Sequence, residues 1–154
     1  MSDQQISLLE AIEARIDSEG FDSLTSYERQ AFAVSWLFIE AFKGGLHQFF
    51  FNEAGRLADD AVRGLEMVGA DRHADILQRA IALFPDGRIP HDLVKRRGLL
   101  TSLPDEIQWD RMDTLTKEFF QMAADHDVDA LLRDYVFGHM NLFPSYHRNS
   151  SQSR

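Results

Sequence analysis

The sequence predicts an all-α protein, a single compact helical domain of about six to eight helices. Apolar residues recur along the chain every three or four positions, as they do on one face of an α-helix. No stretch shows the period of two that a half-buried β-strand needs, so no sheet is expected. With 154 residues, 44% of them hydrophobic, the chain can bury one core. We therefore expect one domain over residues 1–147 and a polar tail over residues 148–154.

Two helices are expected before residue 44. The first covers about Gln4 to Ser18, where apolar residues have helical spacing and Gly20 marks the end. Thr25 and Glu28 have the spacing of a capping box, which starts a second helix over about residues 26–43. Large apolar side chains surround this helix on most sides: Phe32, Val34, Trp36, Leu37, Phe38, Ile39 and Phe42. Such a helix is typical of the buried centre of a fold.

A helical hairpin is expected next. A Gly-Gly pair precedes a short apolar segment, residues 46–51, which we expect to form one helical turn packed into the core. Residues 56–84 have the pattern of an αα-hairpin. Its first helix, over residues 56–68, ends at Gly69, and Asp71 is expected to cap its second helix.

The last third of the chain begins irregularly. Residues 85–87, Pro-Asp-Gly, predict a turn. A short basic helix over residues 90–97 and a connector over residues 99–104 should follow. Helical spacing returns over residues 105–122 and again over residues 127–137, which predicts two closing helices.

The composition argues against several kinds of chemistry. The chain has no cysteine, so it has neither a disulfide nor a thiolate metal site nor a cysteine nucleophile. It contains no nucleophile elbow, P-loop or dinucleotide fingerprint. The formal net charge of −9, from 25 acidic and 16 basic residues, repels phosphate backbones and anionic lipid. We expect no enzyme, no cofactor, and no direct binding to nucleic acid or membrane.

The sequence also favours a cytoplasmic location. Its first residues carry acids where a targeting peptide would carry bases. The longest apolar-rich stretch, Ala31 to Phe42, is interrupted by Ser35 and Glu40. It is shorter than the roughly 20 residues that span a bilayer.

The histidines offer weak candidates for a metal or acid–base site. Asp125 to Asp129 gathers carboxylates around His126, but it lacks the glycine and the glutamate of an EF-hand loop. We therefore interpret this segment as an exposed link whose Asp127 caps the last helix. His47 lies near a phenylalanine cluster and is expected to be a structural histidine, and His73 is expected to be solvated.

Two rows of carboxylates are more informative. Glu10, Glu13 and Asp17 lie at i, i+3 and i+7, and Glu106, Asp110 and Asp113 repeat this kind of spacing. We call them the first and second acidic stripes. Successive carboxylates on a helix face stand roughly 5–6 Å apart, and duplex DNA carries one charge per roughly 1.7 Å of axis. Rigid stripes can therefore imitate the field of DNA, although an acidic helix face can also serve solubility alone.

The stretch from Trp36 to Phe84 resembles the bacterial DNA-mimic protein (DMP) family. The specific part is Gly-Gly followed by Gln48-Phe49-Phe50-Phe51-Asn52, and further matching residues are Glu40, Ala61, Leu65, Ala70, Ile76, Leu77 and Ala80. The chain departs from the pattern at Leu46, where an aromatic residue is expected, and at Lys43, where a small polar residue is more usual. The resemblance implies an all-helical domain, a homodimer, and an acidic surface that occupies a transcription factor's DNA-binding face.

The residues of this signature have structural interpretations. Gly44 and Gly45 permit a sharp reversal at a helix end, and Gly69 separates the two hairpin helices. Phe49 and Phe50 fill the core. Asn52 can cap the next helix.

Two functional hypotheses follow. A third, an enzyme that uses His47 or the acidic cluster over residues 125–129, would need metal-dependent thermal stabilisation to support it. In the first, the protein is a non-enzymatic acidic binding protein that presents both stripes on one face to a basic DNA-binding protein, such as a helix-turn-helix repressor. In the alternative, it is a protein–protein interaction, scaffold or immunity module. That module would bind through apolar groups around residues 85–104, with the basic run Lys95 to Arg97 at the rim.

Overall fold

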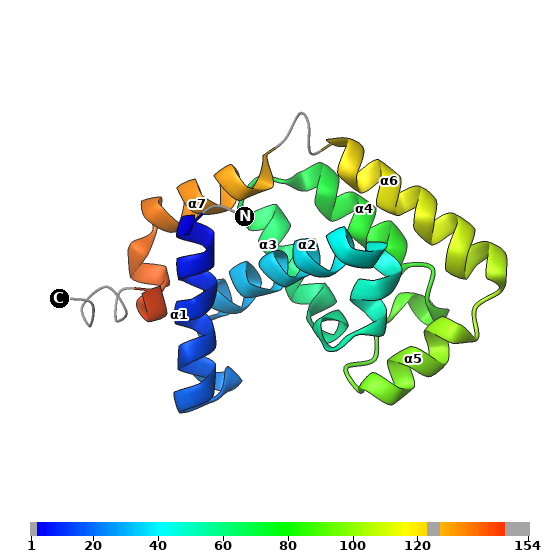
Figure 1. Cartoon of the computed structure of the whole chain (residues 1–154), viewed down its shortest axis with the longest axis horizontal. Coiled ribbons are helices and arrows are strands. Elements are labelled where there is room, and N and C mark those ends of the chain that lie inside the picture. The colour runs from blue at the N-terminus through cyan, green and yellow to red at the C-terminus, as the bar shows by residue number, and fades with distance from the viewer. Residues whose placement is uncertain (1–2, 123–126, 147–154) are drawn as a thin grey trace.

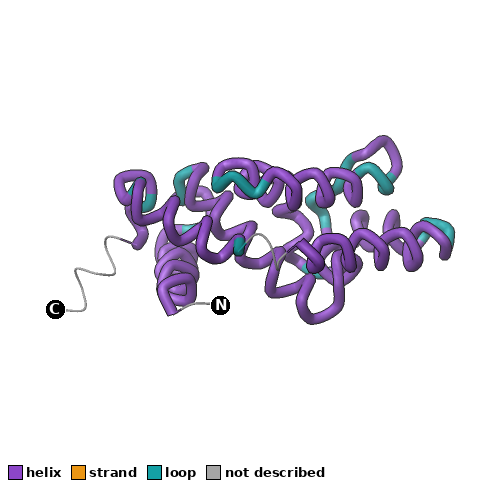
Figure 2. Tube along the Cα trace, turned by 90° about the horizontal axis from the view of Figure 1, so that it is seen from above, coloured by secondary structure: helices purple, strands orange, loops and turns teal. Residues whose placement is uncertain are grey.

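The computed structural model describes residues 3–122 and 127–146 (Figure 1). Within these ranges the main α-helices are α1 (Asp3–Glu19), α2 (Ser26–Phe51), α3 (Ala58–Met67), α4 (Asp71–Ile81), α5 (Leu93–Thr101), α6 (Met112–Gln121) and α7 (Val128–Gly138). Short helical segments connect them: η1 (Phe21–Ser23), η2 (Glu53–Leu57), η3 (Pro85–Gly87), the π-helical η4 (Glu106–Arg111) and η6 (Met140–Leu142). The described ranges contain no strand (Figure 2), which confirms the all-α prediction.

Helix α2 is the centre of the fold, as predicted. It packs against α1, α3, α5, α6 and η2 and crosses the middle of the molecule in Figure 1. The largest apolar side chains that are fully buried include Leu37, Leu46, Phe49, Phe50, Leu65, Ile76, Leu77, Phe84 and Phe119. Residues from α2 to α6 therefore share one core.

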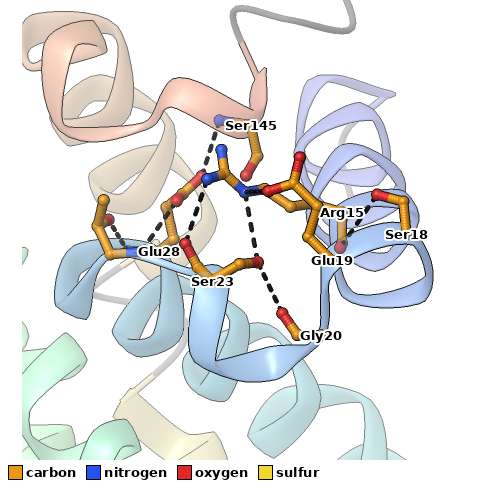
Figure 3. A network of polar contacts seen from close by, with 8 residues as sticks. Arg15, Ser18, Glu19, Gly20, Ser23, Glu28 and Ser145 are labelled. Atoms are coloured by element: carbon orange, nitrogen blue, oxygen red, sulfur yellow. Dashed lines mark hydrogen bonds and ion pairs between the residues drawn. The ribbon is translucent and has the colours of Figure 1, made fainter.

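The start of α2 is fixed by the predicted capping box. Thr25 Oγ1 accepts a hydrogen bond from the Glu28 amide, and the Thr25 amide donates to Glu28 Oε1, each at 3.1 Å. Glu28 is fully buried, and its Oε2 accepts a further bond from the Ser145 amide at 2.9 Å (Figure 3). Thr25 Oγ1 also donates to the Leu142 carbonyl at 3.0 Å. One cap thus attaches the end of the described chain to the central helix.

The end of α1 joins the same region. Gly20 has φ 88° and follows α1 directly, which agrees with the predicted stop. Arg15 Nη2 donates to the Ser23 carbonyl at 3.2 Å, and Arg15 Nε lies 3.4 Å from Glu19 Oε2 (Figure 3). These contacts hold η1 against the first helix.

Helix α2 is interrupted at the Gly-Gly pair. Gly44 has φ −156° and ψ 23°, and Gly45 has φ 77° and ψ −175°, a backbone region that is essentially restricted to glycine. The pair divides α2 into a first arm, residues 26–43, and a second arm, residues 46–51. The Leu46 amide then donates to Thr116 Oγ1 at 3.0 Å, which fixes the second arm against α6. The predicted reversal and the buried helical turn after it are confirmed.

The predicted hairpin is formed by α3 and α4. These helices pack against each other, and Gly69, with φ 84°, lies between them. Gly64 lets α3 approach α2 closely, because a Cβ there would lie 2.5 Å from the Gln30 carbonyl oxygen. The hairpin is thereby pressed onto the central helix.

Several predicted helix starts were wrong. The cap position of α4 is Ala70, and Asp71 is already helical. The segment before α3 is η2, so α3 begins at Ala58 rather than Arg56. Asp92 caps α5 through a 2.8 Å bond from the Lys95 amide. This helix therefore begins later than Pro90 and extends to Thr101, into the predicted connector. Capping by Asp127 was right, with a 3.1 Å bond from the Ala130 amide.

Two predicted burials were also wrong. Phe42 is 83% exposed, because it lies at the end of the first arm, on a side that none of the described elements covers. His73 is fully buried rather than solvated. Its ring packs at 5.9 Å from Phe38 and 4.9 Å from Phe119, since α4 turns this position towards the core.

Replacement of Gly45 by alanine tests the reversal. The Gly45→Ala variant should lose about 1–3 kcal/mol of unfolding free energy, because alanine is strained at this φ and ψ. Its Cβ would also lie 3.1 Å from Thr116 Oγ1. Urea unfolding measures the change.

Gly98→Ala is the matched control. Gly98 lies within α5 and a Cβ there would meet no atom within 4 Å, so alanine should raise stability by up to about 1 kcal/mol. A Gly45→Ala protein as stable as the wild type would contradict this account of the reversal.

Candidate functional site

A buried carboxylate holds the two arms of α2 together. Glu40, on the first arm, is 8% exposed. Its Oε2 accepts hydrogen bonds from Gln48 Nε2 at 3.1 Å and from Asn52 Nδ2 at 2.6 Å. A Cβ on Gly44 would collide with the Gln48 side chain, so the signature glycine also makes room for this contact. The prediction that the Asn52 side chain caps the next helix was therefore wrong. The side chain makes no capping hydrogen bond and binds Glu40 instead.

A buried arginine holds the end of the second arm. Arg96 is fully buried and donates through Nε to the Phe50 carbonyl at 2.8 Å and through Nη2 to the Asn52 carbonyl at 2.7 Å. Its Nη1 donates to the Pro90 and His91 carbonyls, both at 3.0 Å. Carbonyls at a helix end lack helical donors and carry partial negative charge. The guanidinium satisfies them and ties α5 to α2, while its burial lowers the pKa of Arg96.

The neighbouring arginine reaches the same helix end at the surface. Arg97 Nε donates to the Phe51 carbonyl at 2.7 Å. Its guanidinium lies over the Phe51 ring, 4.2 Å from the centroid. This stacking fixes the orientation of a half-buried cation.

An open groove of about 410 Å³ lies beside these contacts. Its walls come from α2 and η2, with one residue from α5. The lining residues are Phe32, Trp36, Glu40, Asn52, Glu53, Ala54, Arg56, Leu57 and Arg97. We call it the Trp36 groove; its lining combines apolar walls with charges of both signs.

The structure does not bring the two acidic stripes together. Figure 1 shows α1, with the first stripe, towards one end of the long axis, and the yellow-green segment before α6, with the second stripe, towards the other. Glu10 and Asp17 are exposed and Glu13 is half-buried. The two stripes therefore lie far apart along the molecule, and we consider each of them separately.

The second stripe surrounds an exposed tryptophan. Glu106, Asp110 and Asp113 are all exposed, and Trp109, between them, is 52% exposed. Asp113 also pairs with Lys117 at 3.0 Å, an exposed contact of small energy. We call Glu106, Trp109, Asp110 and Asp113 the Trp109 surface.

His47 has a structural role at the base of this surface. Its ring stacks on Trp109 with 4.1 Å between centroids and an interplanar angle of 21°. Its Nε2 lies 3.2 Å from Oε1 of Gln108, which is 5% exposed. Gln108 Nε2 also donates weakly to the Leu103 carbonyl at 3.3 Å. The tryptophan is thus held from below by the second arm of α2.

The described residues contain no cluster of three or more histidine, aspartate and glutamate side chains that could hold a metal ion. The sequence candidate at residues 125–129 lies partly outside them, because residues 123–126 are not described. None of the described helices is long and apolar enough to cross a membrane.

Residues 85–104 do not form the surface that the scaffold hypothesis required. The most exposed large hydrophobic side chain in this segment is Val94, at 78%. Ile89 and Leu100 are buried. Within the basic run, Arg96 is fully buried and holds the end of the second arm, and Arg97 is half-buried on Phe51.

Three features escaped the sequence analysis. The groove depends on how η2 crosses α2, and no local pattern encodes that crossing. Trp109 does not fall on the apolar face of the helix predicted over residues 105–122, and this position in the sequence pattern could have indicated that its side chain is exposed. Arg96 was grouped with its basic neighbours because a buried arginine has no distinctive sequence pattern.

Replacement of Arg96 by methionine tests its role. The Arg96→Met variant should lose at least about 2 kcal/mol of unfolding free energy. A carbonyl left buried without a donor costs about 1–3 kcal/mol. The Phe50 carbonyl would lose its Arg96 donor, and the Asn52 carbonyl would keep only the bond from the Gly55 amide. The exposed neighbour Lys95, changed to methionine, should stay within about 0.5 kcal/mol of the wild type. Equal urea midpoints for the two variants would disprove the role.

Comparison with known proteins places the chain in a family. The sequence model of the family described as DMP19-like protein matches residues 22–139, which is more than half of the chain. A search of curated proteins finds no match, and a search of solved structures finds none either. The match covers α2, the Gly-Gly reversal, the αα-hairpin and the second acidic stripe, and it confirms the resemblance drawn from the signature. The chain belongs to the DMP19-like protein family.

Proposed function

We propose that this protein acts by binding and not by catalysis, as a DNA mimic that occupies the DNA-binding face of a basic protein such as a helix-turn-helix transcription factor. The observation that carries the proposal is the Trp109 surface, in which exposed carboxylates surround a half-exposed tryptophan. Residues 105–113 contain four acids and one base. A positive face that normally meets phosphates would find complementary charge there.

The rigidity of the Trp109 surface supports this proposal. Gln108 is buried directly beneath it, and His47 supports the indole ring from the second arm of α2. A preorganised surface loses little conformational freedom when it binds. Tryptophan is also enriched among the residues that dominate binding energy at interfaces.

The first acidic stripe contributes at longer range. Because α1 lies far along the molecule from the Trp109 surface (Figure 1), its carboxylates would not touch the same small partner domain. They still add to the net charge of −9, which attracts a basic partner before contact. The second stripe therefore provides the docking surface.

We also propose that the chain forms a homodimer, as the resemblance implies, with Phe42 in the contact. Among the described residues, Phe42 is the most exposed large hydrophobic side chain, at 83%. Full burial of such a side chain contributes about 1.5–3 kcal/mol.

The dimer proposal is tested by sedimentation. Phe42→Ser should weaken dimerisation by about tenfold or more, since 1.4 kcal/mol corresponds to a factor of ten. Val94→Ser is the control, because Val94 is 78% exposed on another helix. If Phe42→Ser and Val94→Ser had equal dimer dissociation constants, Phe42 would not be part of the dimer contact.

Capture of the partner from host lysate tests the proposed function. The immobilised protein should retain a DNA-binding protein at low salt and release it as salt rises from about 0.1 M towards 1 M. Over this range the screening length falls from about 10 Å to about 3 Å. The partner is identified by mass spectrometry, and its affinity is then measured against variants.

Reversal of Glu106, Asp110 and Asp113 to lysine should weaken the complex by at least about tenfold. The matched control reverses three exposed acids elsewhere, Asp59, Glu66 and Asp71, which gives the same change in net charge. Equal loss in both triple variants would show that only net charge matters. A salt-resistant complex, or no DNA-binding protein, would refute the proposal.

A further inference from the structure

We infer that the Trp36 groove binds a small zwitterion with a bulky apolar body, and the best-matched chemical class is a free amino acid with an aromatic side chain. This site is separate from the Trp109 surface and goes beyond the proposed function. The inference rests on three properties of the groove: its size and apolar wall, a half-satisfied buried carboxylate, and an oriented cation.

The apolar wall is a stripe along the first arm of α2. Phe32 and Trp36 are one helical turn apart, and their rings meet edge to face with 6.4 Å between centroids. Leu57, on η2, adds a further apolar side chain to the lining. The volume of about 410 Å³ lies within the range of about 300–1,000 Å³ that is usual for small-molecule sites. This end of the groove suits an aromatic ring.

Glu40 supplies the acceptor. It follows Trp36 by one turn and is more than nine-tenths buried, with Oε2 occupied by Gln48 and Asn52. The described residues give no hydrogen bond to its second oxygen, Oε1, although Glu40 lines the groove. A carboxylate oxygen that opens onto a partly apolar groove without a protein donor is free to accept a charge-assisted hydrogen bond from a ligand. An ammonium group entering from the groove would satisfy it.

Arg97 supplies the donor of opposite charge. Its Nε bond to the Phe51 carbonyl and its stacking on the Phe51 ring fix the guanidinium plane. Its two terminal nitrogens have no acceptor among the described residues, and the side chain lines the same groove. A carboxylate matches a guanidinium of fixed orientation.

The pair of charges selects a zwitterion. The Glu40 carboxylate would repel a simple anion in the groove, and the Arg97 guanidinium would repel a simple cation. The rim adds no net preference, because Glu53 and Arg56 are exposed and carry opposite charges. An α-amino acid carries both signs on one carbon, next to its side chain.

The test uses L-phenylalanine and two analogues that each lack one charge. The full chain, labelled with ¹⁵N, has two tryptophans, so its two indole N–H signals report the groove through Trp36 and the Trp109 surface, which is not part of the groove lining, through Trp109. A Trp109→Phe variant assigns them. Phenylalanine should shift the Trp36 signal in a saturable manner and leave the Trp109 signal in place.

Phenethylamine, which lacks the carboxylate, and 3-phenylpropionate, which lacks the ammonium group, should each bind about tenfold or more weakly. Arg97→Gln should reduce phenylalanine affinity to a similar degree, whereas Lys95→Gln, the same charge change at an exposed site on α5, should not. Glu40→Gln should also weaken binding; if that variant does not fold, the Arg97→Gln result decides.

Three results would overturn the inference. The first is a Trp36 signal that no ligand shifts selectively at millimolar concentration. The second is equal binding of all three ligands, which would show apolar burial alone. The third is unchanged phenylalanine affinity in Arg97→Gln. Because partner capture depends on the Trp109 surface, each outcome is independent of whether the DNA-mimic proposal holds.

Discussion

The rest of the structure depends on how the second arm of α2 is held against the first. Two glycines allow the chain to reverse, but they do not select one direction. The Glu40 carboxylate does so by accepting hydrogen bonds from Gln48 and Asn52 on the returning arm. Arg96 then closes the free end of that arm by satisfying its carbonyls. Both groups are buried, so each contact forms in a low-dielectric setting where an unpaired alternative would be costly.

The second arm in turn positions both candidate surfaces. Its outer side carries His47 and Phe51, whose rings are 6.2 Å apart and nearly parallel. Trp109 stacks on His47 at one end of this row, and the Arg97 guanidinium stacks on Phe51 at the other. One short helical turn thus orients the tryptophan of the Trp109 surface and the cation of the Trp36 groove. The family signature therefore supports surface chemistry although most of its residues are structural.

The sequence predicted the elements better than their surroundings. The Thr25–Glu28 capping box, the Gly-Gly reversal and the αα-hairpin depend on residues close in sequence, so spacing and turn chemistry were sufficient. Burial of His73, exposure of Phe42 and the pairing of Asn52 with Glu40 depend on which helix covers which face. The acidic stripes were visible as patterns, but their separation along the molecule was not. The groove could not be predicted, because α2, η2 and α5 form it jointly.

Competition with DNA is the most direct test of the central claim that the acidic surface takes the place of DNA on its partner. The captured partner would be bound to a fluorescent duplex and titrated with the wild-type protein. The account predicts that the duplex is released as the protein binds, and that the apparent affinity of the protein falls as more duplex is added. A stable ternary complex of partner, duplex and protein would contradict it, since two ligands that share one face cannot bind together.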